Sequence, residues 1–267
     1  MTTSENETFQ LSTEAAEFYE AKFVPAIFGQ WAPQLLDFAG VATGHDLLDV
    51  ACGTGVVART AKRSAKADAS IVGVDLNDAM LAVAARAEPT IDWRQGDAGA
   101  LPVADDSFDA AVCQMAFMFF ADPVAVLREM RRATRPGGTV AALVPAALDD
   151  QPAYRRFMKL AVDELGLEAQ PLLSAYWACG DLDAFAGNFT AAGLHRLETA
   201  TRTGTAHFDS PEDFVTTEIC GSPLGDTTGP EAISRLGRAV ATDMPEWHHA
   251  DGTYRVPLVC HLVLGHA

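Results

Sequence analysis

The sequence predicts an α/β fold with a doubly wound, mostly parallel seven-stranded sheet and helical cap insertions. Two observations carry this prediction: short apolar runs alternate with helical stretches from residue 46 to about residue 144, and two further strand-like runs follow. Strands that alternate with helices imply parallel crossover connections and helices on both faces of the sheet. The predicted strands are residues 46–50, 70–75, 91–94, 108–113, 139–144, 194–208 and 256–264.

The predicted helices begin at recognisable capping residues. Asp122 and Pro123 open one helix, which ends before residues 136–138, because a capping side chain followed by proline starts helices and a Pro-Gly-Gly run stops them. Asp150 is expected to cap a helix from Pro152 to the glycine at 166. Further helices are expected at residues 56–66, from residue 78, at residues 181–192 and from residue 210.

Three segments depart from the regular alternation and are predicted to cap the sheet. Residues 1–40 form an N-terminal helical cap, rich in aromatic residues and interrupted at Pro25 and Pro33. Residues 41–267 form the main domain, with cap insertions at about 146–180 and 209–255. The first insertion carries Tyr154, Phe157 and Met158 at helical spacing, a pattern typical of either a core face or a ligand pocket.

Composition excludes several classes of function. The 267 residues are 49% hydrophobic and 21% charged, which is enough apolar material for a full core. Lys and Arg number 19 against 36 Asp and Glu, a net charge of −17. A chain this acidic repels phosphate backbones and anionic lipids, so no nucleic-acid partner is expected.

Targeting and cysteine patterns point to the cytoplasm. No apolar run is long enough to span a membrane, and the N-terminus is polar and acidic rather than a signal peptide. The five cysteines are widely spaced and form no Cys-x-x-Cys pair. Neither a disulfide scaffold nor a metal site is therefore expected, and a reducing compartment fits best.

The most informative segment is residues 47–58, where an apolar strand runs through small residues directly into a helix. Ala51, Gly53 and Gly55 let the backbone turn sharply, and they let a ligand contact main-chain N–H groups at the start of the helix. Asp75 ends the next strand about 20 residues later, where a carboxylate can accept both ribose hydroxyls of a nucleoside. The pattern therefore predicts a nucleoside site at these strand ends.

The third and fourth strands end in residues that suit the same site. Asp97 follows the third strand and can accept a hydrogen bond from an adenine amino group. Gln114 and Met115 end the fourth strand, next to the point where doubly wound sheets bind ligands. Suitable groups at four successive strand ends predict one binding site rather than isolated turns.

Residues 46–144 resemble class I S-adenosylmethionine-dependent methyltransferases, and within them the small-molecule enzymes similar to those of ubiquinone and menaquinone biosynthesis. The first motif of that family is matched by Asp49-x-Ala51-x-Gly53-x-Gly55, with alanine where the first glycine usually stands. Residues 101–109 and 135–138 are similar to the family's approaches to its fourth and fifth strands. The resemblance implies a Rossmann-like domain with S-adenosylmethionine as cofactor.

The resemblance also implies roles for individual residues. Ala51 and Gly53 would line the methionine part of the cofactor, and Asp49 would order the loop. Asp75 would bind the ribose, and Asp97 would meet the adenine edge. The remaining residues predicted to bind the cofactor are Leu76 and Met80 flanking the adenine, Ala98 beside Asp97, Cys52 in the loop, and Gln114 and Met115.

Two aromatic residues of the N-terminal cap, Phe23 and Trp31, are predicted to close over the cofactor. The physical reason is that aromatic faces stabilise cations, and a sulfonium is a cation. Packing of these residues in the core is the competing interpretation. The aromatic content of the caps predicts a partly apolar or aromatic small-molecule methyl acceptor.

Two other functions fit parts of the pattern. Gly53-x-Gly55-x-x-Ala58 with Asp75 also matches a dinucleotide fingerprint, as in an oxidoreductase. Against this, Asp49 places a carboxylate in the turn region, where it would repel a pyrophosphate. The second alternative is a non-catalytic nucleoside-binding partner subunit. No sequence feature identifies a catalytic residue, the acceptor or the methylated atom, and a homodimer is compatible with the sequence.

Overall fold

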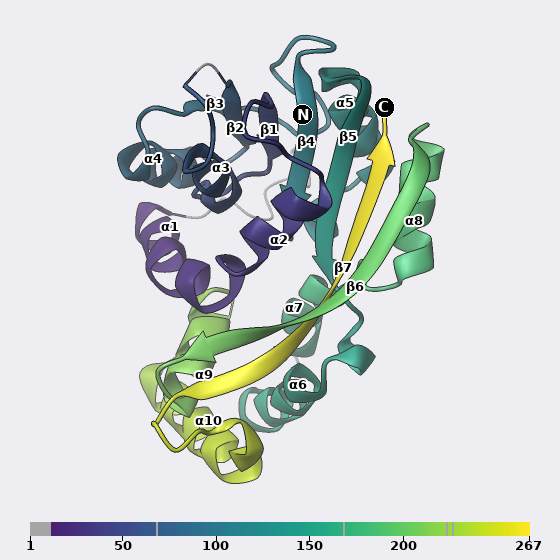
Figure 1. Ribbon diagram of the computed structural model, residues 1–267. Coiled ribbons are helices and arrows are strands. Elements are labelled where there is room, and N and C mark those ends of the chain that lie inside the picture. Colours follow the sequence, from purple (N-terminus) through teal and green to yellow (C-terminus); the bar gives the residue numbers. More distant parts are fainter. Residues whose placement is uncertain (1–11, 68, 168, 223, 226) are drawn as a thin grey trace, which may run out of the picture.

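The computed structural model describes residues 12–67, 69–167, 169–222, 224–225 and 227–267. They form a seven-stranded sheet in the order β3-β2-β1-β4-β5-β7-β6, which confirms the predicted α/β class (Figure 1). The strands are β1 (Leu47–Val50), β2 (Ile71–Asp75), β3 (Asp92–Gln95), β4 (Phe108–Gln114), β5 (Thr134–Pro145), β6 (His195–Phe208) and β7 (Tyr254–His266).

The strand order places a switch point between β1 and β4. From β1 the chain moves outward through β2 to β3 and then returns to the other side of β1, and all these neighbours pair in parallel. β7 pairs antiparallel with both β5 and β6. The carboxyl ends of β1, β2, β3 and β4 therefore meet at one edge of the sheet, where ligands bind in such folds.

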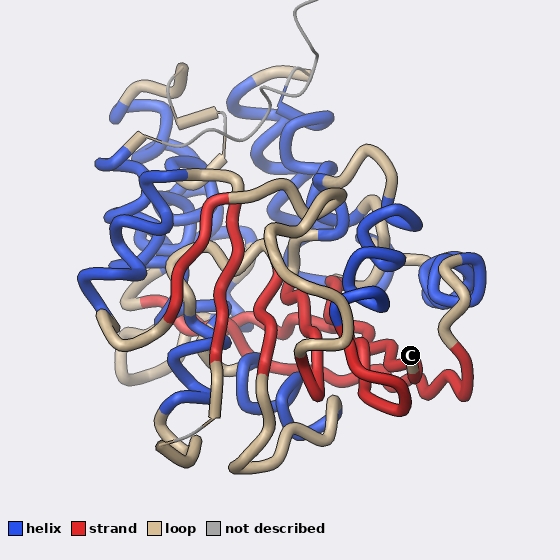
Figure 2. Tube along the Cα trace, turned by 90° about the horizontal axis from the view of Figure 1, so that it is seen from above, coloured by secondary structure: helices blue, strands red, loops and turns tan. Residues whose placement is uncertain are grey.

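Alternate residues of the central strands pack on opposite faces, as the buried apolar runs predict. Leu47 of β1 belongs to one hydrophobic cluster, whereas Leu48 belongs to another. Helices α2 (Trp31–Phe38) and α3 (Val56–Lys62) cover the first face. Helices α5 (Pro123–Ala133) and α8 (Leu182–Ala191) cover the second, and the view in Figure 2 shows helices on both sides of the strands.

Capping side chains start several helices at the expected places. Asp122 accepts a hydrogen bond from the Ala125 N–H at 2.9 Å at the start of α5, and Asn77 caps α4 (Asp78–Ala87) in the same way. The prediction that Asp150 caps α6 (Pro152–Leu165) is wrong. Asp150 ends a short 3-10 turn, and Gln151 is the N-cap residue; its buried amide binds the Val259 backbone of β7 instead of the helix.

The N-terminal helical region is interrupted between its prolines rather than at them. Helix α1 (Thr13–Phe18) continues into a π-helical segment, η1 (Tyr19–Phe28), which contains Pro25, and the break follows at residues 29–30. Pro33 lies in the first turn of α2, where its missing N–H has no helical partner to lose. The π-helical hydrogen bonds, which join residues five positions apart, accommodate Pro25. The Gly29 N–H, for example, donates to the Val24 carbonyl.

The two predicted insertions gather beyond the sheet. The first holds α6 and α7 (Ala169–Ser174), and the second holds α9 (Pro211–Cys220) and α10 (Pro230–Asp243). Residues 203–208 of β6 pair with residues 254–259 of β7 past the end of β5, so this two-stranded extension carries the insertion helices away from the sheet (Figure 1). None of the helices among the described residues is long and apolar enough to cross a membrane.

Candidate functional site

A cavity of about 680 Å³ lies at the carboxyl ends of β1, β2 and β4, between the sheet and the cap segments. A volume of this size is in the usual range for small-molecule sites. Most of the residues predicted from the sequence line it. They are Phe23, Ala51, Gly53, Asp75, Leu76, Met80, Asp97, Ala98, Gln114 and Met115.

The glycine turn after β1 presents its backbone to this cavity. Ala51, Gly53 and Gly55 have φ angles of 52°, 56° and 82°, a left-handed conformation that favours glycine and costs energy at Ala51. Gly55 is also the N-cap of α3, and a side chain there would clash with the ring of Trp93 on β3. The sequence of small residues is thus required by the backbone, as predicted.

Asp75 joins this turn to the end of β2. Its Oδ2 atom accepts a hydrogen bond from the Gly53 N–H at 2.7 Å, and its Oδ1 atom accepts one from the Asn77 N–H at 2.9 Å. Burial raises the pKa of the Asp75 carboxyl, and these hydrogen bonds lower it in part. The carboxylate therefore both anchors the turn and faces the cavity.

Two residues counted among the predicted cofactor-binding set, Asp49 and Cys52, lie behind the turn, and the hydrogen bond of Asp49 fits the loop-ordering role that the resemblance implies. Asp49 does not line the cavity; it is fully buried and accepts a hydrogen bond from the Ala58 N–H at 2.9 Å. Burial raises the pKa of Asp49 to about 7. The Asp49 carboxyl thus lies behind the turn and does not line the cavity. Cys52 is likewise buried and does not line the cavity.

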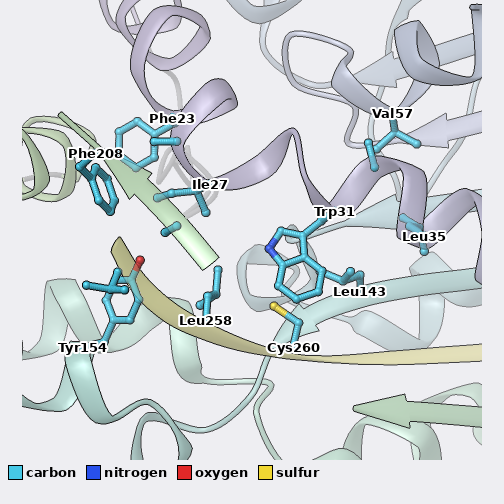
Figure 3. Packing of buried hydrophobic residues seen from close by; sticks show 14 of the residues in the cluster. Phe23, Ile27, Trp31, Leu35, Val57, Leu143, Tyr154, Phe208, Leu258 and Cys260 are labelled. Atoms are coloured by element: carbon cyan, nitrogen blue, oxygen red, sulfur yellow. The ribbon is translucent and has the colours of Figure 1, made fainter. Parts of the chain in front are cut away.

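Trp31 is a core residue, so its prediction as a cofactor contact is wrong. Its side chain is fully buried and does not line the cavity. It packs in the same hydrophobic cluster as Leu143 and Cys260 (Figure 3), and its indole ring leaves room for no side chain at Gly204. The break at residues 29–30 explains the difference, because it turns α2 onto the sheet while η1 stays over the cavity.

Phe23 belongs to a stack of three aromatic rings at the cavity wall that the sequence only partly indicated. Tyr19, Phe23 and Phe28 all come from η1, and their ring centroids are 5.1 to 6.0 Å apart. Burial and the neighbouring Asp75 carboxylate raise the pKa of the Tyr19 hydroxyl. These three residues lie on the same side of η1 because it is a π-helical segment. The sequence does not indicate a π-helix, so their stacking could not be predicted from it.

Gln114 ties the end of β4 to this aromatic stack. Its amide donates a hydrogen bond to the Phe28 carbonyl at 3.2 Å, whereas its buried Oε1 atom has no partner among the described residues. The next residue, Met115, has a left-handed backbone with a φ angle of 53°. An orphaned acceptor and a strained backbone at one strand end are typical of a ligand site.

The insertions supply much of the opposite wall, most of which the sequence does not indicate. Tyr154 of α6 lines the cavity, whereas Phe157 and Met158 of the same helix are buried in the core, so the pocket interpretation holds for Tyr154 alone. The insertion residues of this wall that were not predicted are Tyr176, Trp177, Glu218 and Gly221, and Phe119 from the segment after β4 and Leu258 of β7 complete it. They come from several distant segments, so no local motif marks them.

The cavity therefore has two different halves. The first, which we call the strand-end half, consists of Gly53, Asp75, Asp97 and their neighbours. The second, the cap half, consists of the aromatic and apolar residues of η1 and the two insertions, together with Glu218. Among the described residues, no group of His, Cys, Asp and Glu could hold a metal ion.

Comparison with known proteins identifies the part of the chain that builds the strand-end half. The pattern that defines the methyltransferase domain family matches residues 48–142. These residues are therefore similar to a methyltransferase domain. The match begins in β1, ends in β5 and so stops before either insertion.

Two curated methyltransferases are similar in sequence to part of this chain. A demethylmenaquinone methyltransferase of Renibacterium salmoninarum is 39% identical over 109 residues, which cover 41% of this chain and 45% of that protein. A 2-phytyl-1,4-naphtoquinone methyltransferase of Synechococcus elongatus is 31% identical over 139 residues, or 50% of this chain and 59% of that protein. The chain thus spans about half the length of these curated relatives.

The same fold occurs in a solved enzyme. Phosphoethanolamine N-methyltransferase 2 of Haemonchus contortus, solved in complex with S-adenosyl-L-methionine, superposes with a TM-score of 0.62 at 18% identity. The superposition covers 96% of this chain and 57% of that one. At this identity the likeness confirms the Rossmann-like fold, including its outer segments, and carries no further conclusion.

Proposed function

We propose that this protein transfers the methyl group of S-adenosylmethionine to a small-molecule acceptor that is partly apolar or aromatic. The observation that carries the proposal is that one cavity joins the Gly53 and Asp75 strand ends of a methyltransferase domain to a wall of aromatic side chains. The first half suits a nucleoside with a charged tail, and the second suits a flat acceptor.

The strand-end half fits the cofactor on its own geometry. Asp75 would bind the ribose hydroxyls, Leu76 and Met80 would flank the adenine, and Asp97 with Ala98 would meet the adenine edge. The unpartnered Oε1 atom of Gln114 and the aromatic rings of η1, which line the same cavity, would favour a cationic centre between them. When bound, the sulfonium supplies an already activated methyl group.

The task left to the chain is to position the acceptor and exclude water. Holding two reactants in line contributes up to roughly 7–11 kcal/mol toward lowering the barrier. The stacked rings of η1 and the insertion residues Tyr154, Tyr176 and Trp177 are placed to do this, because they close the cavity above the strand ends.

The names of the relatives support an acceptor of the quinone type. Demethylmenaquinone and phytyl-naphthoquinone each contain a flat bicyclic ring, and the cap half offers aromatic side chains. The domain match ends at residue 142, so the insertions and η1, which would supply most of the acceptor wall, lie outside it. A flat, ring-bearing acceptor is accordingly the substrate class that we propose.

Ligand-induced stabilisation tests the cofactor. S-adenosylmethionine and S-adenosylhomocysteine should each raise the melting temperature, since a ligand at 100 times its Kd stabilises the folded state by about 2.7 kcal/mol. NADH at the same concentration should give no shift. A shift with NADH and none with either S-adenosyl compound would refute the proposal in favour of an oxidoreductase.

A further inference from the structure

Glu218 is the acidic side chain of the cap half. It lies on α9 and lines the same cavity as Gly53 and Asp75, yet its residue is only 8% exposed. Among the described residues, its Oε1 atom has no hydrogen-bond partner. A buried acceptor without a partner destabilises the fold, so its presence in a ligand cavity indicates a ligand that satisfies it.

The surroundings of Glu218 are aromatic. The titratable groups that face it are the phenol groups of Tyr154, from α6, and Tyr176, from the turn after α7. Burial raises the pKa of Glu218 to about 8, and a hydrogen bond from the Tyr154 hydroxyl lowers it in part. The Tyr176 hydroxyl is turned to the backbone, donating to the Gly221 carbonyl at 3.2 Å.

We propose that Glu218 accepts a hydrogen bond from a hydroxyl group of the methyl acceptor and takes that proton during methyl transfer, so that the acceptor is a hydroxylated aromatic compound. This rests on the proposed function. The acceptor oxygen attacks the methyl carbon while the carbon–sulfur electron pair stays on sulfur. The hydroxyl proton passes to the Glu218 carboxylate, leaving a neutral methyl ether, a neutral thioether and a protonated Glu218.

A hydroxyl satisfies this site better than an amine does. A protonated amine would pair with the carboxylate, but it has no free electron pair with which to attack. An aromatic hydroxyl has both a proton to donate and a lone pair, and its ring suits the faces of Tyr154, Trp177 and Phe28. Proton removal by a positioned carboxylate is worth about 10²–10⁴-fold in rate.

Binding of a matched pair of probes tests the proposal without turnover. We would titrate 2-naphthol, and its methyl ether 2-methoxynaphthalene, into protein saturated with S-adenosylhomocysteine, using calorimetry. The wild-type protein should prefer 2-naphthol by about tenfold or more, since a hydrogen bond to a charged group contributes about 1.5–3 kcal/mol. The preference should grow as the pH is raised toward 8, because the ionised carboxylate accepts more strongly.

Variants connect that preference to the residue. Glu218→Leu should abolish it while leaving the affinity for 2-methoxynaphthalene unchanged, and Glu218→Gln should reduce it and remove its pH dependence. Glu212→Gln is the matched control: it makes the same change on the same helix at an exposed position, and the preference should stay. Unchanged affinity for S-adenosylhomocysteine confirms that each variant is folded. If Glu218→Leu does not fold, Glu218→Gln alone carries the test.

The outcomes separate the two proposals. If S-adenosylhomocysteine does not bind the wild-type protein, the proposed function fails. If it binds but 2-naphthol does not, or if 2-naphthol and its ether bind equally, the role of Glu218 is overturned and the proposed function stands. A preference that survives in Glu218→Leu overturns it as well.

Discussion

The two halves of the cavity are built by different means. The strand-end half consists of backbone turns and carboxylates fixed by short hydrogen bonds, such as that of the Gly53 N–H to Asp75 at 2.7 Å. The cap half consists of side chains from η1, α6, η4 (Ala175–Trp177), α9 and neighbouring segments, which meet only because the caps pack over the sheet. The strand-end half thus comes from one continuous segment, whereas the cap half depends on the assembly of several distant ones.

The largest expected effect is the loss of stability in Trp31→Ala, which tests whether this aromatic residue belongs to the core or to the cavity wall. Trp31→Ala should lower the free energy of unfolding by about 3–5 kcal/mol, because it removes a fully buried indole from a packed cluster. The affinity of the folded fraction for S-adenosylhomocysteine should not change. Urea unfolding and calorimetry measure the two quantities.

Phe23→Ala is the companion variant for that test. Its ring faces the cavity, so it should weaken ligand binding as well as stability. If Trp31→Ala weakened binding without loss of stability, the assignment of Trp31 to the core would be wrong.

The next effect concerns Asp75. Asp75→Ala should weaken S-adenosylhomocysteine binding by about 2–4 kcal/mol, because two ribose hydroxyls would lose a charged partner and the Gly53 N–H would lose its acceptor. Asp92→Ala, at the exposed start of β3, is the control and should bind normally. Unchanged calorimetric affinity in a folded Asp75→Ala variant would remove Asp75 from the site.

A smaller effect follows from the raised pKa values of the buried carboxyls, about 7 for Asp49 and about 8 for Glu218. A raised folded-state pKa means that the folded protein binds the proton more tightly than the unfolded chain does. Stability should therefore fall as pH rises from about 5 to about 8, by at most about 1.4 kcal/mol per pH unit and group.

Substitution shows how much of that slope belongs to the cap half. The glutamine of Glu218→Gln cannot ionise. The free energy of unfolding of this variant should therefore fall less between pH 5 and pH 8 than that of the wild-type protein. Urea titrations at several pH values measure the slope. Identical slopes in the two proteins would contradict the buried, uncompensated environment assigned to Glu218.

The smallest effect tests how the caps are held together. Lys22 of η1 forms an ion pair with Asp213 of α9 at 2.7 Å, on the side where the Phe23 ring packs against Gly221. Lys22→Met should cost only about 0.2–1 kcal/mol, as for other partly exposed pairs. Hydrogen exchange in η1 should quicken in this variant and slow when S-adenosylhomocysteine is added. Exchange in η1 that ignores the ligand would mean that the caps do not respond to the cofactor.

The local sequence pattern was sufficient to predict the residues of the strand-end half. The alternation of strands and helices, the small residues at 51, 53 and 55, and the acidic residues Asp75 and Asp97 are all explained by backbone geometry within one continuous segment. Errors arose where an outcome depended on a partner elsewhere. Asp150 does not cap α6, because Gln151 takes the N-cap position. The Gln151 amide is held there by a hydrogen bond to the Val259 carbonyl, more than a hundred positions along the chain.

The sequence by itself determined the strands and helices of the sheet domain and the turn that lines the cavity, because periodicity, capping and left-handed glycine positions act over a few residues. Only the tertiary structure decided that Phe23 lines the cavity while Trp31 is buried behind it, since the two lie on either side of a break whose place depends on a π-helical segment. It also decided that Glu218 is buried among aromatic rings from other helices. The environment of a side chain is set by segments that fold against it, and those contacts have no local signature.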